Sequence, residues 1–348
     1  MSRVFRELLK KIGSGEHTHQ DLSRDEACLA LKLMLTQEAT PAQIGAFLIA
    51  HRIKRPTPAE LAGMLDAYDE LGPKLAPIDS PYPVVVLSQP YDGRDRTVPL
   101  SPVTALVLSS VGIPVLQHGG ERMPTKEGTP LVDVWDGLGI NWRVLSLAGV
   151  QQLLQQGGLG FVYVPRHFPL AYGLVPYREQ IGKRPPIATL ELVWCPYAGV
   201  VQLVAGYVHP PTETIMAAAL QMRGLAHFVT VKGLEGSCDL PRDRTPIVTV
   251  YHQQTPERLR LNPAHYGLYG GNPRWVDLES AIKAMQQVLQ GEANELHASV
   301  VWNSGFYLWQ TGYVPDLESG LTHAQELLRS GQVYHHLQKL QQLAASLC

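Results

Sequence analysis

The chain has 348 residues, a formal net charge of −2 at pH 7, 45% hydrophobic residues and 17% charged residues. This composition excludes an intrinsically disordered chain, and the charge excludes a uniformly basic surface while allowing a local basic groove. No apolar run approaches the roughly 18 residues of a membrane span, and the charged N-terminus lacks the apolar centre of a secretory signal. We therefore expect a soluble cytoplasmic protein. Its cysteines form no CxxC pair, which argues against disulfides or a zinc site: Cys28, Cys195, Cys238 and Cys348.

The first part of the chain is predicted to be helical. Segments 23–26, 40–43 and 57–60 each place a Ser or Thr three residues before a Glu or Gln, the spacing of a capping box. Pro41 and Pro58 follow two of these N-caps, at a position where the missing N–H costs nothing. Apolar residues recur behind each box at helical spacing. Together with a helix over 2–12, this pattern predicts an N-terminal helical domain at 1–76 and a second domain at 77–348.

From residue 83 the pattern changes to strands that alternate with helices. Short apolar, β-branched runs predict strands at 84–87, 113–116, 160–164, 200–204, 227–231 and 247–250. Intervening helices are expected at 101–111, 130–138 and 212–222, and closing helices at 276–290, 316–330 and up to Leu347. Such alternation is typical of a mainly parallel sheet with helices packed outside it.

Two loops that follow predicted strands carry the residues of most chemical interest. Ligands of parallel sheets bind beyond the carboxyl ends of the strands. In the loop 88–101, Ser101 precedes Pro102 as an N-cap precedes a first-turn proline, and such a helix end can hold an anion. In the loop 117–129, glycines and hydroxyls occur with Arg122 and Lys126, a composition that suits phosphate contact. An ordinary capped helix with a solvated turn remains the alternative for the first loop.

Several segments resemble the anthranilate phosphoribosyltransferase family in order along the chain. They include 22–63, the Gln117-His118-Gly119 loop, 161–182, 229–236 and 303–331. The resemblance implies an α/β fold of the nucleoside phosphorylase and phosphoribosyltransferase type, in which a small discontinuous all-α domain packs against a larger α/β domain. A helical segment near 168–183 would join the N-terminal helices in that small domain, and a homodimer through the helical domain is expected.

The resemblance also implies a reaction and a set of site residues. Members of this glycosyltransferase family in tryptophan biosynthesis transfer phosphoribosyl from phosphoribosyl pyrophosphate to anthranilate, with magnesium on the diphosphate. Positions matching phosphoribosyl and diphosphate contacts are Asp92, Gly93, Ser101, Lys126, Gly128 and Thr129. Positions matching acceptor contacts are His118, Gly119 and Arg178, and Asp239 matches a metal ligand. No residue is assigned a catalytic role.

The sequence departs from the family pattern at the diphosphate loop. The family's Gly-Thr-Gly-Gly-Asp is Ser88-Gln-Pro-Tyr-Asp92 here, and Pro90 has no N–H to donate. The family's late Asp-Glu pair becomes Cys238-Asp239, which removes one oxygen ligand for magnesium. The segments 88–94 and 115–119 resemble the YbiB-type branch of the family, which is associated with nucleic-acid binding in a groove of the dimer. The candidate DNA or RNA contacts are Lys10, Lys11, Arg52, Lys54, Arg55, Arg94, Arg96, Lys183 and Arg184.

The residues themselves leave three functions open. The chain is a phosphoribosyl transferase for an aromatic acceptor, a non-catalytic nucleic-acid-binding dimer, or a metabolite-binding or scaffold protein that retains the cleft and Arg178. Structural alternatives also stand beside individual assignments. Arg178 could pair with Glu179 or another carboxylate, His118 could be a hydrogen-bonded structural histidine, and Asp239 could be a solvated loop acid.

Overall fold

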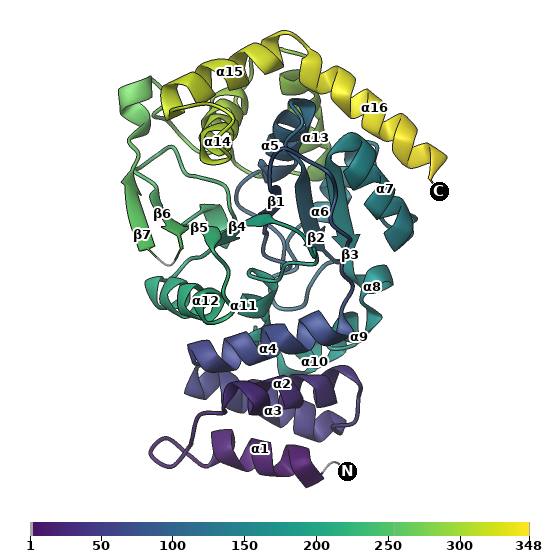
Figure 1. Ribbon diagram of the computed structural model, residues 1–348, viewed down its shortest axis with the longest axis vertical. Coiled ribbons are helices and arrows are strands. Elements are labelled where there is room, and N and C mark those ends of the chain that lie inside the picture. The colour runs from purple at the N-terminus through teal and green to yellow at the C-terminus, as the bar shows by residue number, and fades with distance from the viewer. Residues whose placement is uncertain (1–2, 254, 348) are drawn as a thin grey trace.

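The computed structural model describes residues 3–253 and 255–347, so that Cys348 lies outside the described residues. A helical bundle forms one end of the molecule, a sheet lies at its centre, and the C-terminal helices form the other end (Figure 1). No helix in the described part of the chain combines the length and apolar character needed to cross a membrane.

The bundle is built from the first helices, which begin where the capping boxes predict. Ser23, Thr40 and Thr57 each accept a hydrogen bond from the N3 amide, and the N3 side chain returns one to the N-cap amide. Later in the chain, α10 packs against α3, and α11 and α12 pack against α4. The helices concerned are α1 (Arg3–Gly13), α2 (Arg24–Leu35), α3 (Pro41–Lys54), α4 (Pro58–Leu71), α10 (Val175–Ile181), α11 (Ile187–Glu191) and α12 (Pro210–Met222).

One sheet of seven strands carries the rest of the fold, in the order β3-β2-β1-β4-β5-β6-β7. The pairs from β3 across to β5 are parallel, whereas β5–β6 and β6–β7 are antiparallel. The predicted mainly parallel α/β fold is therefore confirmed. The strands are β1 (Val84–Leu87), β2 (Val115–Gly119), β3 (Leu159–Tyr163), β4 (Val201–Gly206), β5 (His227–Val231), β6 (Ile247–His252) and β7 (Thr255–Arg260).

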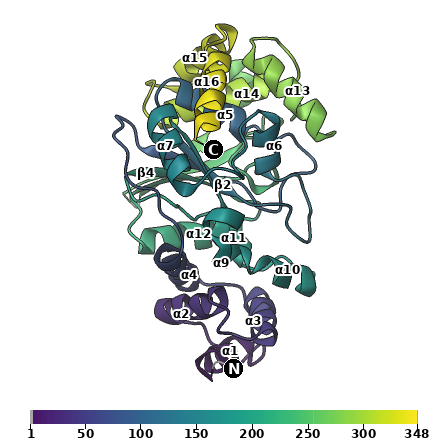
Figure 2. The same cartoon turned by 90° about the vertical axis from the view of Figure 1, so that its right-hand side faces the viewer.

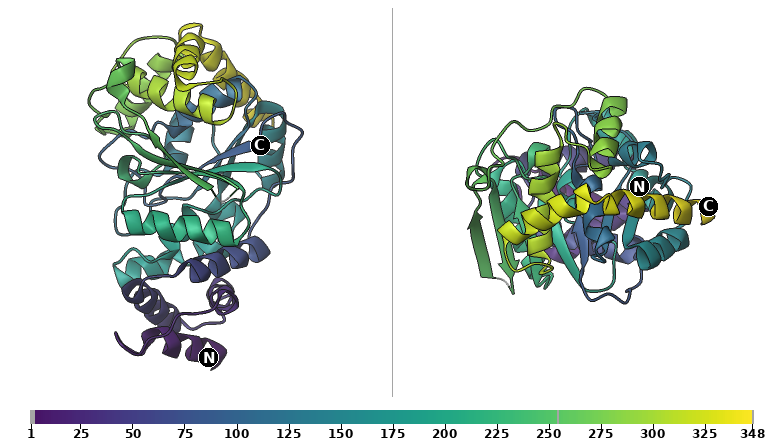
Figure 3. Two further views of the ribbon diagram at one scale, coloured as in Figure 1. Left: turned by 60° about the vertical axis from the view of Figure 1, so that its left-hand side comes forward. Right: turned by 90° about the horizontal axis from the view of Figure 1, so that it is seen from above.

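Helices cover both faces of the sheet (Figures 2 and 3). One face carries α5, α7, α14 and α16, which pack on one another, and α12 lies on the opposite face toward the bundle. The remaining helices are α5 (Ser101–Ser110), α6 (Leu131–Gly137), α7 (Leu147–Gly157), α8 (Val164–His167), α9 (Pro169–Tyr172), α13 (Leu278–Leu289), α14 (His297–Gln310), α15 (Leu317–Arg329) and α16 (Gln332–Ser346), with short 3-10 turns η1 (Leu234–Gly236) and η2 (Pro263–Tyr266).

The sequence patterns missed three longer elements. The helix α14 is buried along most of its length, so it has no polar face to create a helical period. No element is predicted over the helix α7, and β7 is a polar edge strand with exposed side chains and no apolar alternation. The second strand runs Val115–Gly119, further along the chain than the predicted 113–116, because Pro114 has no N–H for the ladder.

Candidate active site

The loop between β1 and α5 replaces the open glycine loop expected from the family pattern. Ser88, Gln89, Tyr91 and Asp92 are all buried. The Gln89 amide nitrogen donates to Cys238 Sγ at 3.0 Å, and the Tyr91 hydroxyl lies 2.7 Å from Nδ1 of His118. Buried side chains therefore occupy this loop, where the family pattern has glycines with accessible backbone amides.

The two loops predicted to contact phosphate bond to each other. Gly128 N donates to Asp92 O at 2.9 Å, Thr129 N donates to Arg94 O at 2.9 Å, and Arg94 N donates to Thr129 O at 3.1 Å. Gly93 has φ +74°, and a Cβ there would lie 2.4 Å from the carbonyl carbon of Gly128. The backbone approach therefore requires glycine, and the amides of Gly128 and Thr129 are already used inside the protein.

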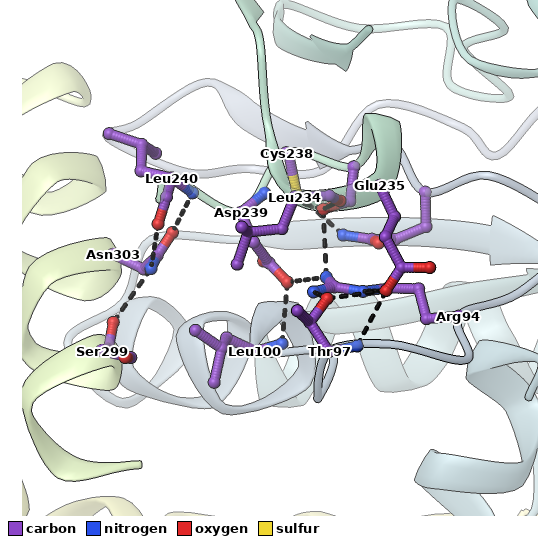
Figure 4. Close-up of polar contacts among 12 residues, drawn as sticks. Arg94, Thr97, Leu100, Leu234, Glu235, Cys238, Asp239, Leu240, Ser299 and Asn303 are labelled. Atoms are coloured by element: carbon purple, nitrogen blue, oxygen red, sulfur yellow. Dashed lines mark hydrogen bonds and ion pairs between the residues drawn. The ribbon is translucent and has the colours of Figure 1, made fainter. Parts of the chain in front are cut away.

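A buried arginine connects the first loop to the loop after β5 (Figure 4). Arg94 is 2% exposed and forms an ion pair with Asp239. Its other contacts are Ser237 Oγ at 3.0 Å and Thr97 Oγ1 at 2.5 Å. The prediction that Arg94 contacts nucleic acid is wrong, because its guanidinium lies in the interior and is neutralised there.

The carboxylate predicted to bind metal is held by the protein itself. Asp239 pairs with Arg94, and its Oδ2 also accepts the amide of Leu100 at 2.8 Å. It is fully buried, which excludes the alternative of a solvated loop acid. Within residues 3–253 and 255–347, no cluster of three or more His, Cys, Asp or Glu side chains is arranged to hold a metal ion. Magnesium, which requires several free oxygen ligands, does not fit the residues at this position.

Ser101 does not act as the predicted N-cap. The helix α5 begins at Ser101, Leu100 occupies the N-cap position, and no side chain caps this helix. The Ser101 hydroxyl and Oδ1 of Asp239 are both buried without a hydrogen-bond partner. The polar groups near this helix start are therefore enclosed by the fold, and the helix end does not open toward solvent.

The histidine predicted to contact the acceptor is part of the interior. His118 lies on β2, where its Nε2 is 3.0 Å from the carbonyl oxygen of Trp194. A carbonyl only accepts, so Nε2 carries the proton and Nδ1 accepts from the Tyr91 hydroxyl. Burial lowers the pKa of His118 to about 4, so the ring is neutral at pH 7. Gly119 ends the same strand and is also buried.

The arginine predicted to hold an acceptor carboxylate already holds one from the chain. Arg178 lies on α10, is buried, and directs Nη1 and Nη2 to the two carboxylate oxygens of Glu191 on α11. This is the fork-to-carboxylate geometry that would otherwise recognise a planar acid. Glu179 is not the partner. An external carboxylate could bind Arg178 in this way only by displacing Glu191.

An open cleft lies between the bundle and the loops after β4 and β5. Its volume is about 510 Å³. Arg52 and Arg55 come from the end of α3, and Arg184 comes from the segment between α10 and α11. Prolines and other apolar groups form much of the remaining wall: Pro56, Pro185, Pro186, Leu192, Tyr207, Val208, Pro210, Pro211 and Ile215. This arrangement combines positive charge with apolar surface.

The three cleft arginines differ in how they are held. Arg52 donates to the carbonyl oxygen of Arg184 at 2.5 Å, and Nε of Arg184 lies 3.2 Å from Asp92 Oδ2. Arg55 is exposed, and among the described residues no acidic side chain pairs with it. Its φ of +69° places it in a conformation that costs a non-glycine residue energy. Such strain is common at functional sites.

The other predicted nucleic-acid contacts do not gather at this cleft. Lys10 and Lys11 lie on α1, where they pair with Glu7 and Glu26. The Lys54 side chain is 2% exposed and pairs with Glu60 and Asp21, so the prediction that it contacts nucleic acid is wrong. Arg96 is exposed near the loop after β5, and Lys183 is exposed beside Arg184.

Two acidic residues that organise this region were missed in the sequence. Glu191 belongs to no motif and is brought to Arg178 only by the packing of α10 and α11. Glu235 lies in the segment 229–236 that resembles the family, but no local pattern predicts a role for it. Its position between Gly233 and Gly236, in the loop that follows β5, was the available signal for a site residue.

Comparison with known proteins agrees with this architecture. The glycosyl transferase family descriptions match in two parts, the helical bundle domain over residues 6–72 and the a/b domain over residues 92–334. Anthranilate phosphoribosyltransferase from Albidiferax ferrireducens is 26% identical over 332 residues, covering 94% of this chain and 93% of the relative. The Acidovorax ebreus enzyme is 26% identical over 330 residues, covering 94% of each chain.

Solved structures show the same fold. Anthranilate phosphoribosyltransferase from Thermus thermophilus has a TM-score of 0.81 at 21% identity, covering 99% of this chain and 100% of that one. The Saccharomyces cerevisiae enzyme in complex with phosphoribosyl pyrophosphate and Mg has a TM-score of 0.85 at 17% identity, covering 100% and 99%. The chain therefore belongs to the glycosyl transferase family that includes the anthranilate phosphoribosyltransferases.

Proposed function

We propose that this chain is a nucleic-acid-binding member of its family, and that it does not transfer phosphoribosyl groups through a magnesium diphosphate complex. The supporting observation is the cleft lined by Arg52, Arg55 and Arg184. The predicted metal ligand Asp239 is instead paired with Arg94. The predicted acceptor residue Arg178 is paired with Glu191. The cleft combines open volume with cations from two elements, the end of α3 and the segment between α10 and α11.

The chemistry of the cleft suits a nucleic-acid strand. Arginines neutralise backbone phosphates, and the counterions that they displace make such binding weaken with salt. Proline rings and Tyr207 give the same cleft apolar surfaces against which sugars and bases can pack. With a net charge of −2, the surface as a whole does not attract polyanions. We therefore expect nucleic acid to bind at the cleft and not elsewhere on the surface.

Fluorescence anisotropy with labelled single-stranded and double-stranded oligonucleotides tests the proposal. The informative variant is Arg52→Ala/Arg55→Ala, because it removes two cleft cations and leaves the Arg184 contact with Asp92 intact. We expect the slope of log affinity against log salt to fall by about 1.5, which is the loss of two phosphate contacts. A matched control is Arg260→Ala/Arg329→Ala, two exposed arginines on β7 and α15. No binding by the unmodified chain at low salt would refute the proposal.

Phosphoribosyl transfer is the second candidate, because the relatives that cover 94% of this chain are named anthranilate phosphoribosyltransferases. A ligand that binds the folded state raises the melting temperature. Because our proposal has no binding site for phosphoribosyl pyrophosphate with magnesium, we expect this compound to leave the melting temperature unchanged. No product should form with anthranilate. A magnesium-dependent rise in melting temperature together with turnover would replace our proposal with the transferase.

We further propose a homodimer through the helical bundle. Between α1 and α3 lies a groove of about 890 Å³ lined in part by Leu9, Ile12 and Ile49. Ile53 lines the same groove and is 76% exposed, so the apolar surface of the groove continues to solvent. Light scattering should give twice the monomer mass. The substitution Ile53→Glu should then produce monomers, and a monomeric unmodified chain would contradict the dimer.

A further inference from the structure

The strand β7 ends the sheet on one side, and the hydrogen bonds of its neighbour β6 determine which of its backbone groups are used (Figure 1). In an antiparallel pair, alternate residues bond across the pair, and the residues between them direct their N–H and C=O groups to the other side. Gln253 N donates to Ala226 O at 2.8 Å, and Lys232 N donates to Ile247 O at 2.9 Å. The odd-numbered residues of β6 therefore bond to β5, and its even-numbered residues bond to β7.

This alternation leaves backbone donors and acceptors of β7 directed away from the sheet. The even-numbered residues of β6 are opposite the odd-numbered residues of β7, which thus use their backbone groups within the sheet. Arg258 and Arg260 direct their N–H and C=O groups outward. Pro256 belongs to the same outward set and offers only a carbonyl. An extended chain can add to such an edge through main-chain hydrogen bonds.

A groove of about 520 Å³ lies beside this edge, between α12 and the β6–β7 hairpin. Ala217 and Ala218 of α12 line it, and their small side chains leave room for those of an added strand. Arg258 lines the opposite wall, where its Nη2 is 3.1 Å from Glu213 Oε2 and 3.2 Å from Thr249 Oγ1. The Arg258 side chain is nevertheless 57% exposed. A guanidinium held in this way keeps Nε and Nη1 for a second carboxylate.

The charges of the edge favour an acidic strand over a second copy of this chain. In an antiparallel pair of β7 with its copy, the registers centred on Arg258 or Arg260 place arginine opposite arginine, and like charges directly opposite each other destabilise a sheet. The register that avoids this places Arg258 opposite Pro256, which has no N–H to donate. A strand with Asp or Glu at alternate positions has neither defect, since its carboxylates lie opposite the two arginines.

We propose that β7 and the groove beside α12 bind an extended acidic segment of another protein, which adds to the sheet as an antiparallel strand. The outward backbone groups of Arg258 and Arg260 supply the pairing, and their side chains select the carboxylates. The surface is separate from the cleft, which α12 lines with other residues, among them Pro211 and Ile215. The proposal is therefore independent of nucleic-acid binding.

Fluorescence anisotropy tests the proposal with a labelled peptide of about eight residues in which glutamate and valine alternate. We expect saturable binding, and none by the matched peptide with lysine in place of glutamate. A glutamate opposite Arg258 directs its own N–H to β7, whereas the valines direct theirs to solvent. N-methylation of the glutamates should therefore weaken binding at least about tenfold relative to N-methylation of the valines, because it removes the donors of the ladder.

Two substitutions at one position separate charge from pairing. Arg260→Thr keeps the outward N–H and should weaken binding about two- to fivefold. Arg260→Pro also removes that N–H and should weaken binding about a further fivefold, while the bonds between β6 and β7 stay intact. Arg52→Ala/Arg55→Ala should bind the peptide unchanged. If Arg260→Pro does not fold, the two N-methylated peptides decide the question.

Each contrary result overturns the proposal. It fails if both N-methylated peptides bind equally, if folded Arg260→Pro binds as tightly as Arg260→Thr, or if Arg52→Ala/Arg55→Ala abolishes binding, which would place the peptide in the cleft. Hydrogen exchange should show that the peptide protects residues 255–260. If protection there instead rises with protein concentration in the absence of peptide, a second copy occupies the edge and the proposal is wrong.

Discussion

The interior and the cleft of this protein use the same side chain in opposite ways. Arg94 and Arg178 are buried, and each is neutralised by a carboxylate of the chain. Arg52 and Arg55 line the cleft and face solvent. Because a buried charge must be paired while an exposed one need not be, substitutions in the interior should change stability. Substitutions in the cleft should instead change binding.

The largest effect is expected at the buried pair of Arg178 and Glu191. Replacing Glu191→Gln leaves the guanidinium charge buried without its partner, which should lower the free energy of unfolding by about 3–5 kcal/mol. Urea denaturation measures the loss. The double variant Arg178→Met/Glu191→Leu removes both charges and should recover most of the stability. If Glu191→Gln costs less than about 1 kcal/mol, the pair is not the structural element described here.

The next largest effect depends on pH and concerns Glu60, the partner of buried Lys54. Burial opposes ionisation of Glu60, but bonds from His51, the Leu22 amide and Lys54 lower its pKa from 4.5 to about 2. Because the pKa is lower in the folded state, the stabilisation is present above about pH 4.5 and is lost as pH falls toward 2. The cost of Glu60→Gln should be about 3 kcal/mol at pH 7 and should shrink below pH 4.5. The exposed control Glu7→Gln should change little, and a cost independent of pH would contradict this reading.

A smaller loss is expected at the hydrogen bond between Tyr91 and His118. The change Tyr91→Phe removes the hydroxyl that satisfies Nδ1 of a buried, neutral imidazole. An unsatisfied buried acceptor costs about 1–3 kcal/mol. Chemical denaturation should show this loss, while oligonucleotide affinity stays unchanged because neither residue lines the cleft. If Tyr91→Phe instead weakened oligonucleotide binding strongly and left stability unchanged, Tyr91 would belong to the binding site and not to the interior.

The smallest effect on stability should have the opposite sign, at Arg55. Glycine adopts φ +69° without the penalty that arginine pays, so Arg55→Gly should raise the free energy of unfolding by up to about 1 kcal/mol. The same change should lower the salt slope of nucleic-acid binding by about 0.7–0.9. Opposite changes in stability and affinity would mark Arg55 as a residue kept for binding. If Arg55→Gly lowered both stability and affinity, Arg55 would have a structural role like that of Arg94 and Arg178.

Local chemistry in the sequence determined the elements of the fold that depend on short-range pattern. The capping boxes at Ser23, Thr40 and Thr57 start helices because each satisfies orphan amides within a few residues. The apolar runs of β1, β4 and β5 mark strands because both faces of a parallel sheet are buried. The domain boundary near residue 76 and the dimer remain predictions.

Only the tertiary structure decided which polar residues are available to a ligand. Neighbours in sequence, Lys54 and Arg55, differ completely, because one meets Glu60 and Asp21 in the bundle and the other reaches the cleft. Arg94 meets Asp239 across 145 positions of sequence, and no local pattern encodes that distance. Charge and residue type are properties of the sequence, but burial and the choice of counter-ion arise when distant segments pack together.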